Sequence, residues 1–253
     1  MSRDTPWLAQ QASSGPTRCR LICFPYACGS ARVFHHWAKS LPGVEVFAVE
    51  APGKGSRLLE PPSSNLEDVC AALLAEIASL AKQSLPYNLF GHSYGGLLAY
   101  ELANRLQAAG LPQPQHLFLS ACGAPWAREL RLYSTLDDAE FKDLLADYNA
   151  TPPEVLANAA MLGLLLPGLR ADFTMVETYK SNWSTLERVS VHLFHGADDE
   201  IATDELQAWQ QRVAQKITME CLPGGHFFIH DQRDRLLNAI SAHLCAKSVA
   251  FTI

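Results

Sequence analysis

The sequence predicts an α/β fold in which a mostly parallel central sheet is flanked by helices on both faces. Two observations predict it: short β-rich runs alternate with longer helical patterns, and most of the runs are continuously apolar. Strands buried on both faces of a parallel sheet have this continuous apolar character, because helices cover them from either side. The 253 residues, 48% of them hydrophobic, are enough to bury one sizeable core, so we expect a single domain over residues 1–253.

The expected elements alternate along the chain. Strands are expected at 21–24, 44–49, 87–90, 117–120, 191–195 and 217–221. Helices that cover the sheet are expected at 66–83, 97–109 and 204–215. Ahead of them, residues 1–15 lack the apolar stretch and the cleavage site of a secretory signal, and we interpret them as a short leader.

A long stretch of purely helical pattern interrupts this alternation between the fourth and fifth expected strands. Within it, residues 151–154 read Thr-Pro-Pro-Glu, which is typical of a capped helix start. One apolar face then follows at helical spacing, formed by Val155, Leu156, Ala159, Leu162 and Leu166. An insertion at this point lies over the carboxyl ends of the strands, where ligands bind in such sheets. We therefore interpret residues near 127–185 as a helical lid; the alternative is a subdomain that only stabilises the fold.

Composition argues against several other classes of function. The formal net charge of −6 provides no broad attraction to phosphate backbones or anionic membranes, so we expect neither nucleic acid nor membrane as a partner. The most apolar segment, residues 161–166, is too short to span a bilayer, and we expect the following Pro167 and Gly168 to end it. Seven scattered cysteines, an odd number, favour a reduced, cytoplasmic setting.

Neither a metal nor a nucleotide cofactor is expected. The spacing of Cys19, Cys23 and Cys28 has no second paired cluster, as a zinc site would need. Residues 53–56, Gly-Lys-Gly-Ser, lack the preceding glycine and the helix-opening context of a phosphate loop. We interpret them as a turn after the second strand, which leaves Lys54 and Arg57 near the rim of a site.

Residues 91–95 read Gly-His-Ser-Tyr-Gly and fit the nucleophile elbow of the α/β-hydrolase fold. The context is more specific than the pattern, because the string directly follows an expected strand and precedes a helix whose leucines recur every fourth residue. Such a sharp turn needs residues without bulky Cβ groups on either side, which Gly91 and Gly95 supply. Ser93 would then be held exposed in a strained backbone as the nucleophile, whereas the alternative is an ordinary glycine-rich turn.

A serine hydroxyl needs a neighbouring base to take its proton, and a third group to orient that base. In this fold they follow in the chain order serine, acid, histidine. His226 is the best candidate for the base, because it lies in a glycine-rich loop at the carboxyl end of the last expected strand. The rivals fit less well: His195 precedes the acid candidates, His230 lies where a helix should begin, and His92 points away within the elbow.

The acid is expected in the turn after the strand at 191–195, where Asp198, Asp199 and Glu200 are consecutive. The spacing glycine-x-x-aspartate favours Asp199, and Asp198 is the main rival because adjacent residues at a strand end point in different directions.

The oxyanion formed in acyl transfer needs hydrogen-bond donors as well. In this fold one donor is the amide that follows the nucleophile, here that of Tyr94, and the other comes from the loop after an early strand. That loop follows the strand at 21–24, so the amide of Ala27 is the natural second donor and that of Tyr26 the fallback.

The chain resembles the type II thioesterases that accompany polyketide synthases and nonribosomal peptide synthetases. The likeness extends over nearly the whole chain. It includes Phe24-Pro25-Tyr26-Ala27-Cys28-Gly29-Ser30, Pro52-Gly53-Lys54-Gly55-Ser56-Arg57, the elbow, the lid strings 151–156 and 165–173, and Gly224-Gly225-His226-Phe227-Phe228. Two positions depart from the family pattern: Cys28 stands where glycine is usual, and Glu200 where proline is common.

The resemblance implies an enzyme that hydrolyses acyl groups from the phosphopantetheine arm of acyl or peptidyl carrier proteins, with Ser93, Asp199 and His226 as its triad. The phosphopantetheine belongs to the substrate, so no cofactor of the enzyme itself is implied, and a cytoplasmic monomer is expected. We expect Tyr26, Leu162, Leu166 and Phe173 to contact the acyl chain. Rival hypotheses are an acyltransferase or an esterase for small esters on the same fold, or a noncatalytic protein that binds carrier proteins.

Overall fold

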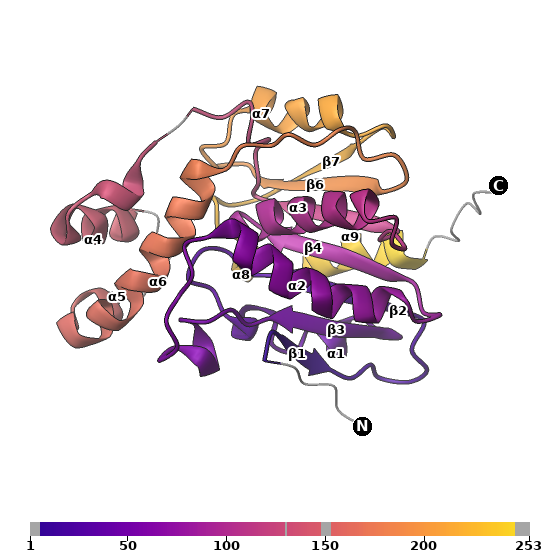
Figure 1. Ribbon diagram of the computed structural model, residues 1–253, viewed down its shortest axis with the longest axis horizontal. Coiled ribbons are helices and arrows are strands. Elements are labelled where there is room, and N and C mark those ends of the chain that lie inside the picture. Colours follow the sequence, from indigo (N-terminus) through magenta and orange to yellow (C-terminus); the bar gives the residue numbers. More distant parts are fainter. Residues whose placement is uncertain (1–5, 130, 148–152, 246–253) are drawn as a thin grey trace.

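The computed structural model describes residues 6–129, 131–147 and 153–245. Its centre is a seven-stranded sheet in the order β1-β3-β2-β4-β5-β6-β7 (Figure 1). The strands are β1 (Leu8–Gln11), β2 (Cys19–Phe24), β3 (Val44–Val49), β4 (Tyr87–His92), β5 (His116–Ser120), β6 (Ser190–Gly196) and β7 (Thr218–Leu222). Strands β2 to β7 pair in parallel, so the predicted fold class is confirmed.

The edge strand β1 corrects the interpretation of residues 1–15 as a leader. It pairs antiparallel with β3, with Leu8 opposite Val49 and Gln11 opposite Val46. Leu8 is only 2% exposed and belongs to the core. The strand reads Leu-Ala-Gln-Gln, with only Leu8 buried, and so lacks the continuous apolar pattern of the inner strands.

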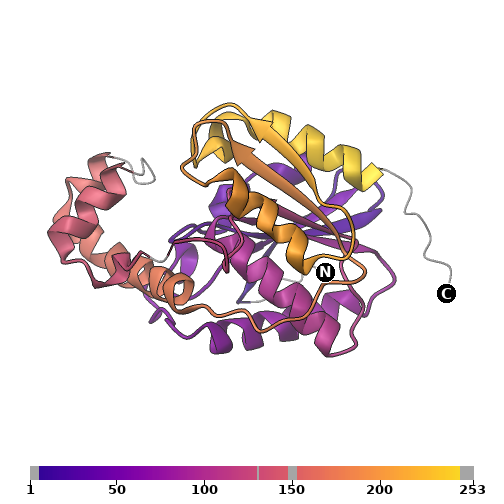
Figure 2. The same ribbon diagram turned by 90° about the horizontal axis from the view of Figure 1, so that it is seen from above.

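Helices cover both faces of the sheet (Figure 2). On one face, α2 (Leu66–Ala81) and α3 (Tyr94–Ala108) pack on a core that α7 (Thr203–Gln207) extends. On the other, α1 (Trp37–Ser40), α8 (Phe228–Asp231) and α9 (Arg233–Cys245) pack around a second core. The helix predicted at 204–215 is shorter than expected, because α7 passes into a 3-10 turn at Ala208–Arg212.

The segment between β5 and β6 forms α4 (Asp138–Asp147), α5 (Pro153–Leu156) and α6 (Ala159–Thr178). These helices project from one end of the sheet (Figure 1). The helix start predicted at Thr151 and Pro152 lies outside the described residues, and the apolar pattern that continues from it is divided between α5 and α6. Asn158 caps α6, since its side chain accepts hydrogen bonds from the amides of Ala160 and Met161.

Pro167 does not end the apolar segment, as the sequence had suggested, but lies inside α6. In the described part of the chain, α6 is the one helix whose length and composition would allow it to cross a membrane, a criterion that core helices of soluble proteins also meet. It carries the buried Asp172 and packs against the sheet domain, as described below.

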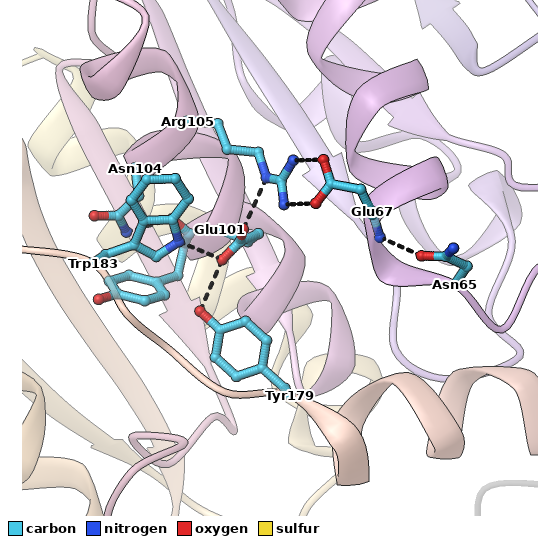
Figure 3. Close-up of polar contacts among 8 residues, drawn as sticks. Asn65, Glu67, Glu101, Asn104, Arg105, Tyr179 and Trp183 are labelled. Atoms are coloured by element: carbon cyan, nitrogen blue, oxygen red, sulfur yellow. Dashed lines mark hydrogen bonds and ion pairs between the residues drawn. The ribbon is translucent and has the colours of Figure 1, made fainter.

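The C-terminal end of α6 is attached to α3 by a buried carboxylate (Figure 3). Glu101, 3% exposed, accepts hydrogen bonds from the hydroxyl of Tyr179 at 2.8 Å and the indole of Trp183 at 2.7 Å. Arg105 binds the same carboxylate at 2.8 Å and extends the network to Glu67 on α2. This network holds the chain where it returns from α6 to the sheet.

Three histidines on β5, β6 and α9 form a cluster that makes the stability of the fold sensitive to acid. His116 and His192 share a hydrogen bond of 2.9 Å, and the ring of His243 lies 3.8 Å from that of His192. Burial, followed by the charge of neighbouring histidines, lowers the pKa of His192 to about 3 and that of His116 to about 4. The folded protein therefore holds both rings neutral at pH values where the unfolded chain is protonated.

We expect the stability of the fold to decrease as the pH falls from 6.5 towards 4. The unfolded chain takes up protons at the ordinary histidine pKa while the folded state does not, and each such proton contributes a slope of at most about 1.4 kcal/mol per pH unit. Urea denaturation at pH 7, 6, 5 and 4 measures this slope. His192→Gln should make this slope shallower, because it removes the group with the most strongly lowered pKa of the pair. Equal slopes in the wild type and the variant would contradict the prediction.

Candidate active site

The nucleophile elbow forms at the junction of β4 and α3. Ser93 has φ 54° and ψ −119°, a conformation that side chains rarely adopt, and precedes the first residue of α3. The amide of Ser93 donates to the carbonyl of Ser120 at 2.8 Å, which continues the pairing of β4 with β5. The parallel sheet therefore holds the strained residue, and its side chain lines a cavity.

The two glycines of the elbow make this turn possible by close backbone contacts. A Cβ on Gly91 would lie 2.1 Å from the carbonyl oxygen of Gly95, and a Cβ on Gly95 would lie 2.1 Å from that of Phe24. These close contacts explain why both positions require glycine, as the sequence predicted.

We expect Gly95→Ala to destabilise the protein by about 3 kcal/mol or more, at the upper end of overpacking costs, because its Cβ would collide with backbone rather than with a movable side chain. The midpoint of urea denaturation measures the loss. Gly163→Ala is the matched control: a Cβ there meets nothing within 4 Å inside α6, so we expect a gain of about 0.5–1 kcal/mol. A Gly95→Ala protein as stable as the wild type would contradict the predicted collision.

The structure brings the three predicted triad residues together. The Nε2 atom of His226 lies 2.9 Å from Oγ of Ser93, and its Nδ1 atom lies 3.1 Å from both carboxylate oxygens of Asp199. The side chain of Asp199 is 3% exposed, whereas Asp198 is exposed at the mouth of the cavity. With Nδ1–H donating to the carboxylate, Nε2 is the basic nitrogen that faces the serine hydroxyl.

The loops that carry Asp199 and His226 approach each other at Gly196. A Cβ at that position would lie 2.4 Å from the carbonyl oxygen of Gly224, and the amide of Asp198 donates to the same carbonyl at 3.0 Å. The glycine-rich sequence around both residues therefore serves the contact between the loops.

The sequence predicted only that His92 points away from Ser93. The structure shows that it also supports the histidine loop. It is fully buried, and its Nε2–H donates to the carbonyl of His226 at 2.9 Å. Its Nδ1 lies 2.9 Å from Oγ of Ser120 and accepts that hydroxyl proton. Burial and then the neighbouring His226 lower the pKa of His92 far below its usual value, so the ring stays neutral and braces the backbone of His226.

The predicted oxyanion loop is a tight turn beside the elbow. The amide of Gly29 donates to the carbonyl of Tyr26 at 2.8 Å and closes the turn, with Ala27 and Cys28 at its centre. Cys28 has φ 60°, in the region that favours glycine, which accounts for the glycine usual at this position in the family that the sequence resembles. Ala27 lines the cavity together with Ser93 and Tyr94.

Lys54 does not lie at the rim, where the sequence had suggested it would be. Its side chain is 4% exposed and pairs with Asp172 of α6 at 2.5 Å.

The cavity has a volume of about 950 Å³ and extends from Ser93 under α6. Its apolar wall is formed by Leu97, Leu144, Leu145, Leu169, Phe173 and Val176. Of the residues expected to contact an acyl chain, Tyr26 and Phe173 line the cavity. Leu162 and Leu166 are not among its lining residues; both are buried in a cluster between α4 and α6 that supports this wall. No group of three or more possible metal ligands occurs in the described ranges.

Comparison with known proteins agrees with this geometry. Residues 19–244 match the Thioesterase domain family. The chain belongs to this family. The thioesterase is 30% identical to the gramicidin S biosynthesis protein GrsT of Aneurinibacillus migulanus, with 96% of each chain covered. It is also 30% identical to the thioesterase PikA5 of Streptomyces venezuelae, with 94% of this chain and 85% of PikA5 covered.

Solved structures are similar over most of the thioesterase. The type II thioesterase BorB from the borrelidin biosynthetic cluster superposes with a TM-score of 0.86 at 32% identity, covering 96% of this chain and all of BorB. The predicted resemblance to type II thioesterases and the α/β-hydrolase fold are therefore confirmed, and the protein is a hydrolase that acts on thioesters.

Proposed function

We propose that this thioesterase removes acyl groups from the phosphopantetheine arm of acyl or peptidyl carrier proteins, using Ser93 as nucleophile, His226 as base and Asp199 as the group that orients the base. One observation carries the proposal: His226 bridges Ser93 at 2.9 Å and the buried Asp199 at 3.1 Å, in a cavity that has an apolar wall. Relatives are named for gramicidin S and borrelidin biosynthesis, which makes a carrier-bound substrate the natural class.

The proposed reaction proceeds through an acyl-enzyme. Oγ of Ser93 attacks the thioester carbonyl carbon while Nε2 of His226 takes the hydroxyl proton. The amides of Ala27 and Tyr94 stabilise the oxyanion of the tetrahedral intermediate. The C–S bond then breaks, and His226 returns its proton to the departing sulfur, which leaves as the thiol. Water, deprotonated by His226, attacks the acyl-enzyme and releases the carboxylic acid.

The helical segment at residues 127–185 acts in this proposal as a lid over the acyl chain. The support is that the cavity lies between the elbow and α6, whose residues Leu169, Phe173 and Val176 form part of its wall. A long apolar acyl group needs such a cover, whereas the arm reaches Ser93 from the open side. No cofactor takes part in these steps, and a cytoplasmic monomer is the expected form.

The experiment is a comparison of three donors that carry the same hexanoyl group: a carrier protein, coenzyme A and p-nitrophenol. We expect kcat/KM with the carrier protein to exceed that with the other two by at least about tenfold, since only it adds binding energy from protein contacts. A preference for the nitrophenyl ester would point to a small-ester esterase. Acyl transfer to an added thiol in place of hydrolysis would point to an acyltransferase, and a lack of turnover with all three would exclude catalysis.

A further inference from the structure

The proposed oxyanion donors are the amides of Ala27 and Tyr94. One face of α6 contacts both the turn that contains Ala27 and the side chain of Tyr94. We propose that Asp172 is a positioning residue, which holds the turn at Tyr26–Gly29 so that the amide of Ala27 can stabilise the oxyanion only while α6 is seated. This inference rests on the proposed function, because it assumes the oxyanion hole of Ala27 and Tyr94. It adds a role for a residue on the proposed lid that touches neither the nucleophile nor its base.

The turn has two central amides, and they differ in their partners. The amide of Cys28 donates to Oδ2 of Asp172 at 2.7 Å. The amide of Ala27 has no hydrogen-bond acceptor in the described part of the chain, although Ala27 lines the cavity beside Ser93. Since consecutive peptide planes in a tight turn are coupled, the bond to Asp172 also determines where the Ala27 amide points.

Asp172 is held firmly by its other contact. It is 1% exposed, and its Oδ1 lies 2.5 Å from Nζ of Lys54, which is 4% exposed. A buried carboxylate with these two donors has little freedom to move, because an unpaired buried charge would be strongly unfavourable. One turn earlier in α6, a Cβ on Gly168 would lie 3.2 Å from the carbonyl oxygen of Gly53, so the helix sits directly on the loop that bears Lys54.

Tyr94, whose amide is the second proposed donor, contacts the same face of α6 through its side chain. Nζ of Lys54 lies 5.1 Å from the centre of the Tyr94 ring. The hydroxyl of Tyr94 donates to Sδ of Met175 at 3.7 Å. Met175 is three residues after Asp172 and therefore shares its face of the helix.

The far end of the loop that contains the Tyr26–Gly29 turn is anchored without α6. Glu50, directly after β3, accepts the amide of Ala31 at 2.6 Å, and its other oxygen accepts the amide of Ser56 in the loop that bears Lys54. The bond to Ala31 holds the far end of the oxyanion loop to the sheet, whereas the amide of Cys28 in the turn is bonded to α6. Displacement of α6 would therefore remove the bond to the Cys28 amide, while Ala31 and the hydroxyl of Tyr26, which is 3.0 Å from His230, would stay anchored. The central peptides of the turn would then lose their fixed orientation, and oxyanion stabilisation would weaken.

The test compares two neutral replacements of the Asp172–Lys54 pair. Asp172→Asn with Lys54→Met keeps an acceptor for the Cys28 amide, whereas Asp172→Leu with Lys54→Met removes it at similar volume. For hexanoyl carrier protein we measure kcat and KM per active site, counted by titration with a fluorophosphonate. We also measure the inhibition constant of a hexyl trifluoromethyl ketone, which forms a tetrahedral oxyanion on the serine.

We expect the leucine variant to lose about 10- to 100-fold in kcat, less than the full effect of removing an oxyanion donor, with KM nearly unchanged. Its inhibition constant for the ketone should rise by the same factor, and the asparagine variant should stay within about fivefold of the wild type. Equal kcat values in the two variants, whether high or low, would overturn the proposal. If the leucine variant does not fold, Asp172→Glu replaces it: the charge is kept but shifted by one methylene, and an unchanged kcat overturns the proposal.

Two control variants test whether the effect is specific to Asp172. Glu101→Gln weakens another buried carboxylate that ties the end of α6 to α3 (Figure 3), and it should lower stability without changing kcat per active site. A similar loss of kcat in that variant would mean that any loosening of α6 is enough and would overturn the specific role of Asp172. Ser93→Ala tests the proposed function: if hydrolysis needs Ser93 but not Asp172, only the inference fails.

Discussion

Ser93→Ala is expected to lower kcat for thioester hydrolysis by about 10⁴-fold or more while the protein stays folded. The loss is large because the hydroxyl supplies the bond to the acyl group, and its 2.9 Å contact identifies it as the group that His226 would deprotonate. The fold should tolerate the change, since the Ser93 side chain makes no capping bond to α3 and alanine carries the same Cβ through the strained turn. Single-turnover assays with acyl carrier protein and a thermal melt measure the two effects.

The exposed Ser64→Ala provides a matched control, because it removes a hydroxyl from the loop before α2, far from the elbow in sequence. It should keep wild-type turnover and react fully with a fluorophosphonate, whereas Ser93→Ala should not react. Appreciable turnover by Ser93→Ala would mean that another group attacks the thioester.

The sheet was predictable because its inner strands have one strong signal. Mostly apolar runs located β2 to β6 within a few residues, since strands covered by helices on both faces have no polar side. The edge strand β7 was also expected at nearly its observed position, although four of its five residues are exposed. The edge strand β1 lacks this signal, and only its pairing with β3 explains why Leu8 is buried. The prediction for Pro167 was wrong for a related reason: a proline signals a helix end locally, but contacts elsewhere in the fold can keep it within a helix.

The residues of the candidate site also fall into two groups, those that a local sequence pattern predicts and those that it does not. Ser93, Asp199 and His226 could be proposed from sequence because each lies in a short local pattern at the end of an expected strand. The bond from His92 to the backbone of His226 spans 134 residues, and the pair of Lys54 with Asp172 spans 118. Neither has a local pattern, so both required the fold. A lysine among glycines looks like a surface residue until a carboxylate from a distant helix is brought beside it.

The two kinds of residue also differ in what they do. Residues with a local pattern would carry the chemical steps, with Ser93 bonding the acyl group, His226 transferring protons and Asp199 orienting His226. Glu50, His92 and Asp172 instead hold backbone segments in place. All three are buried polar groups with a partner in another segment, which is the arrangement expected of a preorganised site.

Asp199→Asn is expected to lower kcat by about 10³- to 10⁴-fold, whereas Asp198→Asn should stay within about threefold of the wild type. Both oxygens of Asp199 lie 3.1 Å from Nδ1 of His226, so the carboxylate selects the tautomer that leaves Nε2 free to accept the proton of Ser93. An asparagine amide can donate to Nδ1 and so stabilise the opposite tautomer. Asp198 is exposed, and its backbone, not its side chain, is bonded to the histidine loop through Gly224.

The two variants are matched, since each replaces one carboxylate by an amide in the same turn and changes the net charge equally. Their kcat values for hexanoyl carrier protein, together with melting temperatures, separate a loss of orientation from a loss of folding. A greater loss in Asp198→Asn would assign the orienting role to Asp198. Equal, small losses in both would mean that His226 is held by its backbone contact with His92 alone, and that the carboxylate adds little to the basicity of Nε2.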